Sequence, residues 1–212
     1  MALKNKINRF TLNFSLLLLT LAALLLNPVS ALAMENHAAL PSFVQFSKSV
    51  QNGQKEVLRG VYVDNVLALP VVQQPAGNAG YVSSIDGEVT QFGMASQYGN
   101  VGLLAHNHLS GKSFSSLMIG QEVRMIYGDG HVESYVVKEV LKYQALQPNS
   151  PYSSFKNLNG NDTLTAEQMF KRVYFGNRHI TFQTCIEANG NLSWGRLFVI
   201  AIPKEDNSKF DF

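Results

Sequence analysis

The sequence is poor in cysteine and has no cluster of basic residues beyond residue 33. Cys185 is the only cysteine, which excludes an intramolecular disulfide. Surfaces that follow a phosphate backbone need clustered lysine and arginine, so nothing here predicts a nucleic-acid partner. The excess positive charge of the chain belongs to its start. Without Lys4, Lys6 and Arg9, 14 basic side chains remain against 15 acidic ones, a net charge of −1.

The first 33 residues have the three parts of an export signal. Three basic residues precede an apolar run over residues 12–26, and residues 31–33 have the small-x-small pattern that signal peptidase cuts. The run is short for a membrane-spanning helix, which needs about 20 residues. We expect residues 1–33 to be a signal peptide cleaved after Ala33, with an uncleaved N-terminal membrane anchor through residues 12–26 as the alternative. Either outcome makes the rest of the chain extracytoplasmic, secreted or at the cell surface.

Three reactive side chains lie at the ends of strand-like apolar runs. Residues 101–105 lead to His106, residues 180–184 lead to Cys185, and Arg196 begins another run. A thiol, an imidazole and a guanidinium can serve as nucleophile, acid/base and oxyanion stabiliser. Each also has a plainer interpretation: a buried inert cysteine, a core histidine, or an arginine in a surface ion pair. A lone cysteine in an exported chain favours chemistry, because a loose thiol outside the cell oxidises.

A metal alternative stays open beside this one. His108 follows His106 by two residues, so on a continuing strand both side chains would project to one face. Together with Cys185 they could hold zinc with one open coordination position. No carboxylate or second cysteine stands at ligand spacing, and we therefore expect no metal site. His131 and His179 are expected to be exposed or structural, and Trp194 to be a groove or core aromatic.

The remainder of the chain predicts many short strands and one or two helices. Residues 34–59 form a leader with room for one amphipathic helix, residues 60–203 one domain, and residues 204–212 a tail. Thr165 and Gln168 have the spacing of a capping box, and the helix after them should pack its apolar stripe into a core rather than bind a ligand. Many short strands favour a closed or half-closed β-barrel. Strands are expected near residues 60–73, 81–85, 89–92, 101–106, 122–127, 131–141, 179–185 and 196–203, with a hairpin turn at 128–130.

Four segments, taken in order, resemble the sortase family. They are Ala105-His106, residues 113–117 with 120–123, Thr184-Cys185, and residues 196–199. Sortases carry a Gly/Ala-His pair, a Phe-x-x-Leu segment before a "Gly-Asp/Gln-x-Val" strand, a "Thr-x-Thr-Cys" strand and a final strand that begins with arginine. The similarity covers about residues 60–203. It implies a mostly β fold, the sortase eight-stranded β-barrel with one or two short helices.

The same resemblance implies an activity and a set of site residues. It implies a cysteine transpeptidase or peptidase with His106, Cys185 and Arg196 as catalytic residues, and Thr184 and Trp194 as substrate-binding residues. The substrate would be an exported protein with a C-terminal sorting signal, and the acceptor an amine on the cell surface or another protein. No cofactor is implied, and calcium dependence is left open. A non-catalytic secreted β-barrel binding module on the same scaffold is the alternative.

Two departures from the family pattern affect the substrate. The histidine pair reads Ala-His and is followed by Asn107, as in a secreted, sortase-like subtype with an Ala-His-Asn motif. An insert over residues 147–175, which contains the expected helix, separates His106 from Cys185. Such an insert could reshape the substrate groove, so no sorting motif is assigned.

Overall fold

The computed structural model describes residues 40–205. The predicted signal segment 1–33, its alternative as an anchor through residues 12–26, residues 34–39 of the leader and residues 206–212 of the tail lie outside the described residues. Between residues 40 and 205, no helix is both long and apolar enough to cross a membrane.

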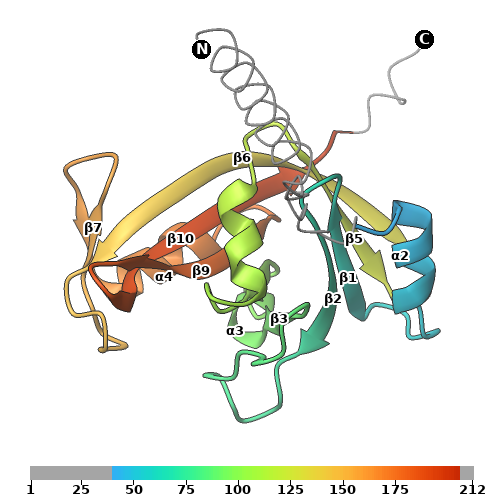
Figure 1. The fold of residues 1–212 in the computed structure, drawn as a ribbon, viewed down its shortest axis with the longest axis horizontal. Coiled ribbons are helices and arrows are strands. Elements are labelled where there is room, and N and C mark those ends of the chain that lie inside the picture. Colours follow the sequence, from blue (N-terminus) through green and yellow to red (C-terminus); the bar gives the residue numbers. More distant parts are fainter. Residues whose placement is uncertain (1–39, 206–212) are drawn as a thin grey trace, which may run out of the picture. The chain divides into compact units, whose positions relative to one another are not determined.

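The described chain consists mainly of β-strands (Figure 1). The elements are, in chain order, helix α2 (Phe43–Val50), β1 (Leu58–Val63), β2 (Leu67–Gln73), β3 (Val89–Phe92), helix α3 (Gly93–Ser96), β4 (Val101–Leu104), the 3-10 helix η1 (Ser110–Ser116), β5 (Glu122–Tyr127), β6 (Val132–Ala145), β7 (Phe155–Asn157), β8 (Thr163–Leu164), helix α4 (Ala166–Tyr174), β9 (Ile180–Ala188) and β10 (Asn191–Pro203).

Eight of these strands close into a barrel. Their order is β10-β9-β4-β3-β2-β1-β5-β6, and β6 pairs again with β10 to complete the ring, while β7 and β8 extend the sheet beyond β6. The pairs β2–β3 and β4–β9 are parallel and the other pairs are antiparallel. The prediction of a mostly β fold with an eight-stranded barrel is therefore confirmed.

The barrel interior is filled by the inward-facing side chains of its strands. Leu103, Phe182 and Val199, from three neighbouring strands, have no exposed surface and belong to one apolar cluster. Phe114 of η1 enters the same cluster, with its ring 5.1 Å from that of Phe182 in a T-shaped contact. Burial of a phenylalanine of this kind contributes about 1.5–3 kcal/mol. The segment that follows His106 in the chain is thereby fixed to the core.

Helix α4 covers the outer face of the sheet. The predicted capping box is present: the Thr165 hydroxyl accepts from the Gln168 N–H, and the Gln168 side chain accepts from the Thr165 N–H. Met169 and Val173 of its apolar stripe are buried against Phe198 of β10 in a second apolar cluster. The prediction that this stripe packs into a core is confirmed.

Helix α2 belongs to the leader and packs on the barrel. Ser42 and Gln45 form a second capping box. Phe46 is buried in a small cluster with Tyr62 of β1 and Ile126 of β5. The leader thus contains the one short helix that its apolar residues allowed.

Several expectations about strands were incomplete or wrong. The strand expected over residues 101–106 ends at Leu104, before His106, and the region 60–73 contains two strands, β1 and β2, joined by a turn. Residues 81–85 form no strand, because side chains rather than a ladder satisfy the backbone there: the carbonyl of Tyr81 accepts from Gln74, and the N–H of Ser83 donates to Thr90. The two final strands are longer than expected, and Asn189-Gly190 joins them into one hairpin. The hairpin predicted around residues 128–130 is confirmed, since β5 pairs with β6.

A polar network joins the β5–β6 hairpin to the segment between α4 and β9. Arg178 donates to the Glu133 carboxylate at 2.7 Å and to the Tyr135 hydroxyl at 2.9 Å, and the hydroxyls of Tyr127 and Tyr135 also donate to Glu133. Burial alone would raise the pKa of Glu133, but the hydrogen bonds from Arg178, Tyr135 and Tyr127 outweigh it and hold the pKa below its ordinary value. Burial, followed by the negative charge of Glu133, raises the pKa of Tyr127 to about 12.

This network predicts an acid-sensitive contribution to stability. A carboxyl group whose pKa is lower in the folded state stabilises the fold above its ordinary pKa and loses that effect as the pH falls. In wild type the free energy of unfolding should therefore decrease below about pH 4.5, the ordinary value for glutamate. Glu133→Gln should flatten this decrease in urea titrations between pH 6 and pH 3, whereas Glu205→Gln at an exposed position should not. An identical pH dependence in wild type and Glu133→Gln would contradict the assignment.

Candidate functional site

Cys185 and Arg196 face each other across the final hairpin. They are direct partners in the antiparallel pairing of β9 with β10. The Ala105 N–H donates to the Gln183 carbonyl, so the odd-numbered residues of β9 direct their backbone groups toward β4 and away from β10. Cys185 and Arg196 are then a non-hydrogen-bonded pair, the kind that brings opposite side chains closest together. Cys185 is half-buried and is not one of the buried core residues.

An irregularity in β10 selects arginine as the partner of the thiol. Asn189 and Gly190 both have positive φ, at 53° and 73°, as a two-residue hairpin turn requires. Ala188 pairs with Asn191, but Ile186 pairs with Gly195, so β10 contains two extra residues at this point. Without them Trp194 would stand opposite Cys185. The Arg196 guanidinium donates to the carbonyls of Ser193 and Gly195 and so holds the extra residues in place.

His106 follows strand β4, which lies on the other side of β9 from β10. Strand β4 pairs with β9 in parallel, and Leu104 is the partner of Gln183. The Ala105 N–H adds one more hydrogen bond between the two segments, to the Gln183 carbonyl, and the chain then turns at His106. Ala105 belongs to the interior cluster and His106 after it is half-buried, while alternation along β9 and β10 turns Cys185 and Arg196 to the outer face. Strand β9 bears Cys185, its neighbour β10 bears Arg196, and His106 follows two residues after the end of β4, the other neighbour of β9.

The junction between β4 and β9 is held by Thr184 and Gly111. Thr184 is buried, and its hydroxyl donates to the Ala105 carbonyl at 2.8 Å. Gly111 donates its N–H to the His106 carbonyl, and a Cβ at this position would lie 2.3 Å from the Thr184 hydroxyl. Only glycine fits there. In this structure the Thr184 hydroxyl orients the backbone before His106, and its role in substrate binding stays a prediction.

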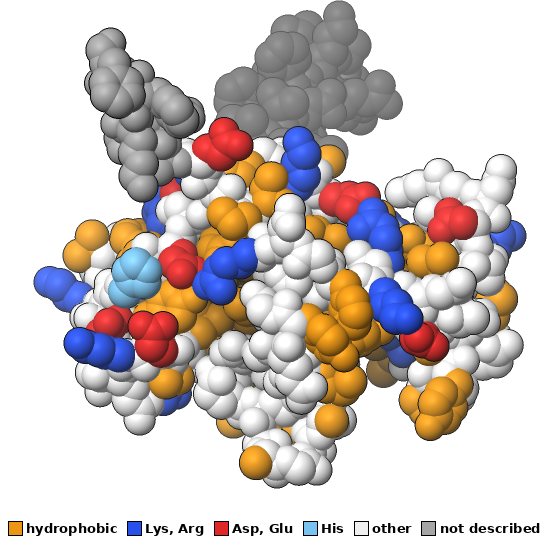
Figure 2. All heavy atoms as spheres, turned by 180° about the vertical axis from the view of Figure 1, so that it is seen from behind, with side chains coloured by type: hydrophobic (Ala, Val, Ile, Leu, Met, Phe, Trp, Pro, Cys, Tyr) orange, Lys and Arg blue, Asp and Glu red, His pale blue; other side chains and the backbone are white. Residues whose placement is uncertain are grey.

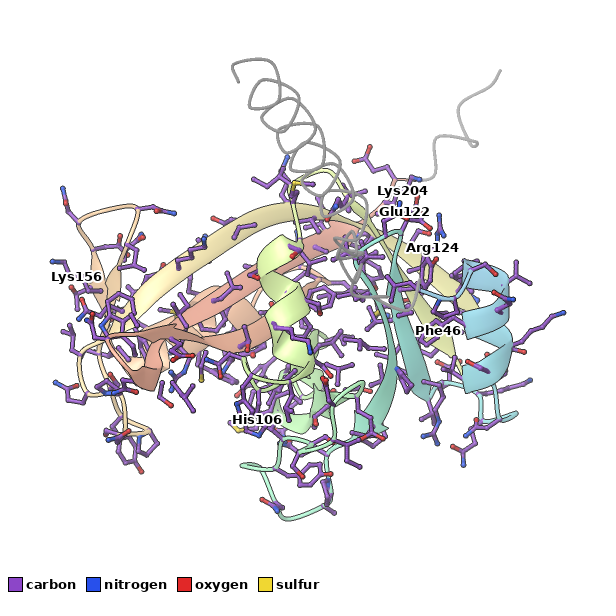
Figure 3. The ribbon with its side chains drawn as sticks, in the orientation of Figure 1. Phe46, His106, Glu122, Arg124, Lys156 and Lys204 are labelled. Carbon is purple, nitrogen blue, oxygen red and sulfur yellow. The ribbon has the colours of Figure 1, made fainter. Side chains whose placement is uncertain are left out.

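The histidine side chains differ in burial and in their contacts. The His106 ring is half-buried and stacks on that of His108 at a centroid distance of 5.5 Å, while His108 itself is exposed in the following turn. Figure 3 shows His106 far from Phe46 of α2 and from Lys204. His131 is exposed. His179 is buried, and its two ring nitrogens face the carbonyls of Asn177 and Val173, so it is a structural histidine, one of the two roles expected for it.

The zinc alternative finds no support in the geometry. Among residues 40–205, no three His, Cys, Asp or Glu side chains form a group that could hold a metal ion. His106, His108 and Cys185 therefore do not converge as a ligand set.

An aromatic groove of about 250 Å³ borders Arg196, between α4 and the sheet. Arg196, Gln183 and Phe198 form its floor, and they share the outer face with Cys185. The insert over residues 147–175 supplies the opposite wall, through Phe155 and the α4 stripe. The insert thus shapes the groove, as its position in the sequence suggested. Trp194 is half-buried and does not line this groove.

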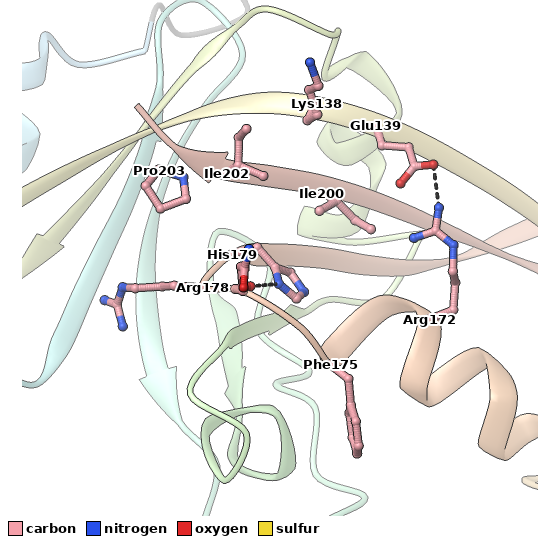
Figure 4. Close-up of a pocket in the computed structure, with 10 residues that line it drawn as sticks. Lys138, Glu139, Arg172, Phe175, Arg178, His179, Ile200, Ile202 and Pro203 are labelled. Carbon is pink, nitrogen blue, oxygen red and sulfur yellow. Dashed lines mark hydrogen bonds and ion pairs between the residues drawn. The ribbon is translucent and has the colours of Figure 1, made fainter. Parts of the chain in front are cut away.

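A larger pocket of about 570 Å³ lies elsewhere on the barrel (Figure 4). Ile200, Ile202 and Pro203 of β10 line it, together with the ion pair between Arg172 and Glu139. None of the predicted site residues lines it, so it is separate from the candidate site.

The charged surface is mixed. Figure 2 shows lysine and arginine side chains interspersed with aspartate and glutamate on the face that it draws. The absence of a nucleic-acid partner stays a prediction.

Comparisons with known proteins find likeness in solved structures alone. No family model matches the chain, and no curated protein matches it. The chain is similar to sortase C1 of Streptococcus suis, at 12% identity over 79% of this chain and 82% of that one, with a TM-score of 0.48. It is also similar to sortase D5 of Clostridium perfringens, at 12% identity over 78% of this chain and 90% of that one, with a TM-score of 0.45. Sortase A of Listeria monocytogenes is similar at 13% identity over 70% of this chain and 88% of that one, with a TM-score of 0.44. At such identities and TM-scores the likeness adds nothing to the assignment of the site, which depends on the chain's own residues.

Gly195, the residue before Arg196, provides a test of the close pairing of β10 with β6. A Cβ on Gly195 would lie 2.5 Å from the Tyr143 carbonyl of β6 and 3.3 Å from Ile186. Gly195→Ala should therefore lower the free energy of unfolding by about 1–3 kcal/mol in urea titrations, the usual cost of overpacking. Gly80→Ala is the matched control, because a Cβ there meets no atom closer than 3.9 Å. Equal stability of the two variants would contradict the close contact between β10 and β6.

Proposed function

We propose that this chain is an exported cysteine transpeptidase that cleaves a peptide through a thioester at Cys185 and transfers the acyl group to an amine. The observation that carries the proposal is the order of three strands: β9 bears Cys185, β10 pairs Arg196 directly opposite it, and β4 on the other side of β9 leads within two residues to His106. The extracytoplasmic location is part of the proposal and depends on the signal segment 1–33.

The first half-reaction forms the thioester. The Cys185 thiolate attacks the carbonyl carbon of the scissile peptide bond, and the carbonyl oxygen takes the negative charge. Arg196 donates to that oxygen with its fork of N–H groups. Its Nη1 is engaged by two backbone carbonyls, and no carboxylate between residues 40 and 205 forms an ion pair with it. The C–N bond then breaks, and His106 gives a proton to the leaving amine.

The second half-reaction transfers the acyl group. An incoming amine attacks the thioester carbonyl, loses a proton to His106, and displaces the Cys185 thiolate as the C–S bond breaks. If water takes the place of the amine, the same steps amount to peptide hydrolysis. The aromatic groove lies beside Arg196 and accepts the part of the donor that stays on the enzyme. In the proposed function this donor is an exported protein with a C-terminal sorting signal.

Capture of the acyl-enzyme tests the proposed function. The protein is incubated with a library of random peptides, and intact-protein mass spectrometry detects covalent adducts that hydroxylamine removes. Adducts should form on wild type and be absent from Cys185→Ala. A wild-type protein that forms no adduct with any library peptide, or adducts that persist in Cys185→Ala, would contradict the proposal and leave a non-catalytic binding module on the same barrel.

The two neighbouring histidines should differ in effect. His106 follows the ladder of β4 with β9, whereas His108 is exposed in the turn beyond it. His106→Ala should abolish turnover of a peptide found by the library, and His108→Ala should retain most of it. The measurement is the steady-state rate of peptide cleavage. Equal losses of the cleavage rate in His106→Ala and His108→Ala would contradict the assignment of His106 as the acid/base residue.

Acylation of Cys185 should require the planar guanidinium of Arg196 as well as its charge. Lysine keeps the charge but loses the planar pair of donors, and loss of one oxyanion donor costs about 10²–10³ in rate. Arg196→Lys should slow single-turnover acylation of Cys185 by about that factor, and Arg196→Ala should be at least as severe. Acylation of Arg196→Ala at the wild-type rate would show that Arg196 is a surface residue without a catalytic role.

A further inference from the structure

The pocket of about 570 Å³ in Figure 4, here named the β10 pocket, has no part in the proposed function. Figure 4 shows Ile200, Ile202 and Pro203 along β10 and Phe175 just after α4, and all four line this pocket. Ile202 and Phe175 keep 41% and 37% of their surface exposed. Pockets of this volume with a mostly apolar lining are the usual binding sites of proteins. The β10 pocket therefore has room for apolar groups that the described residues do not supply.

The charged residues of the β10 pocket are mostly cationic. Lys138, Arg172 and Arg178 line it, against one carboxylate, that of Glu139. Glu139 is already bound to Arg172, and Arg178 is bound to Glu133 outside the pocket. Lys138 is exposed and forms no ion pair with any carboxylate between residues 40 and 205. A negative charge carried beside an apolar group would be attracted to this lysine.

The segment that follows β10 has a matching composition. Residues 206–212, the tail segment, lie outside the described residues and read Asp-Asn-Ser-Lys-Phe-Asp-Phe. Two of these side chains are carboxylates and one is an ammonium, so the segment has a net negative charge. On an extended chain Phe210 and Phe212 project to one side and Asp211 to the other. One short segment thus combines two aromatic groups with a carboxylate between them.

The chain length allows the tail segment to return to the β10 pocket. The Lys204 N–H donates to the Ser134 carbonyl and continues the ladder of β10 with β6, so the chain leaves the sheet next to Pro203, at one end of the pocket. Residues 206–208 are Asp-Asn-Ser, types that turns favour. The four residues after them span about 13 Å when extended, and β10 covers about 10 Å between Pro203 and Ile200.

We infer that the β10 pocket binds the tail segment of the same chain. Phe210 and Phe212 cover the apolar side chains of Ile200 and Ile202, and Asp211 pairs with Lys138 at the rim. Because the segment is tethered next to the pocket, its effective concentration is in the millimolar range, and contacts that are weak between separate molecules suffice. The inference does not depend on the proposed function, since none of the three residues predicted to be catalytic lines the β10 pocket.

The test uses the full chain and a fluorescein-labelled peptide, Asp-Asn-Ser-Lys-Phe-Asp-Phe-amide, whose binding is followed by fluorescence anisotropy. In the double variant Phe210→Ser/Phe212→Ser, here named the tail variant, the pocket should be open to the peptide, whereas wild type fills it with its own tail. A peptide that binds the tail variant with a Kd of about 0.1 mM should bind wild type about tenfold more weakly, given a millimolar effective concentration of the tether. A control peptide with serine at both phenylalanine positions should bind neither protein.

Substitutions in the tail variant locate the peptide. Ile202→Ser should weaken its binding about tenfold, through loss of part of an isoleucine contact. Lys138→Gln should weaken it about two- to fivefold, the size expected of one exposed ion pair. The matched controls are Ile119→Ser, at a side chain that is 67% exposed, and Lys48→Gln on α2. Neither residue lines the β10 pocket, so both controls should leave the affinity unchanged.

Three results would overturn the inference. The first is an absence of binding to the tail variant, or binding that both Ile202→Ser and Lys138→Gln leave unchanged. The second is equal affinity of wild type and the tail variant for the peptide, which would assign the β10 pocket to an external peptide. The third is a wild-type dimer in sedimentation velocity that the tail variant lacks, which would place the tail segment in the pocket of a second copy.

Discussion

The candidate site depends on one interaction, the pairing of β9 with β10 across the turn at Asn189-Gly190. The turn brings the two strands together, and the two extra residues of β10 then set which side chain meets Cys185. An even number of extra residues keeps every side chain on its own face of the sheet, so Leu197 and Val199 still point into the barrel while Arg196 moves opposite the thiol. The core and the site are thus specified by the same register.

The sequence predicted much of the fold because its strongest signals are local. The capping box at Thr165, the hairpin around residues 128–130 and the buried run that ends at Cys185 each depend on neighbouring residues. The closure of the barrel, by contrast, depends on pairing between β6 and β10, which lie far apart in the chain. The eight-stranded arrangement was implied by family resemblance and could not be read from periodicity.

Within the site, the three reactive residues were predictable by type and their placement was not. Asn189-Gly190 is a strong hairpin signal that could have joined the last two strands from the sequence alone. The irregularity between Asn191 and Gly195 has no comparable signal, since it arises from tertiary contacts, among them the close approach of Gly195 to β6. The aromatic groove exists only because α4 packs on the sheet, where the apolar stripe of the helix both packs into a core and lines the groove. The sequence interpretation treated these as alternatives.

A disulfide across the hairpin measures the central register directly. Non-hydrogen-bonded partners on antiparallel strands have Cα atoms about 4.5 Å apart, within the range that a disulfide spans. Arg196→Cys, treated with diamide, should form an intramolecular disulfide with Cys185 in nearly all molecules, detected as loss of two free thiols and of two hydrogens in the intact mass. Trp194→Cys, treated in the same way, should keep both thiols as a monomer. A disulfide in Trp194→Cys and none in Arg196→Cys would contradict the register and, with it, the placement of Arg196 beside the thiol.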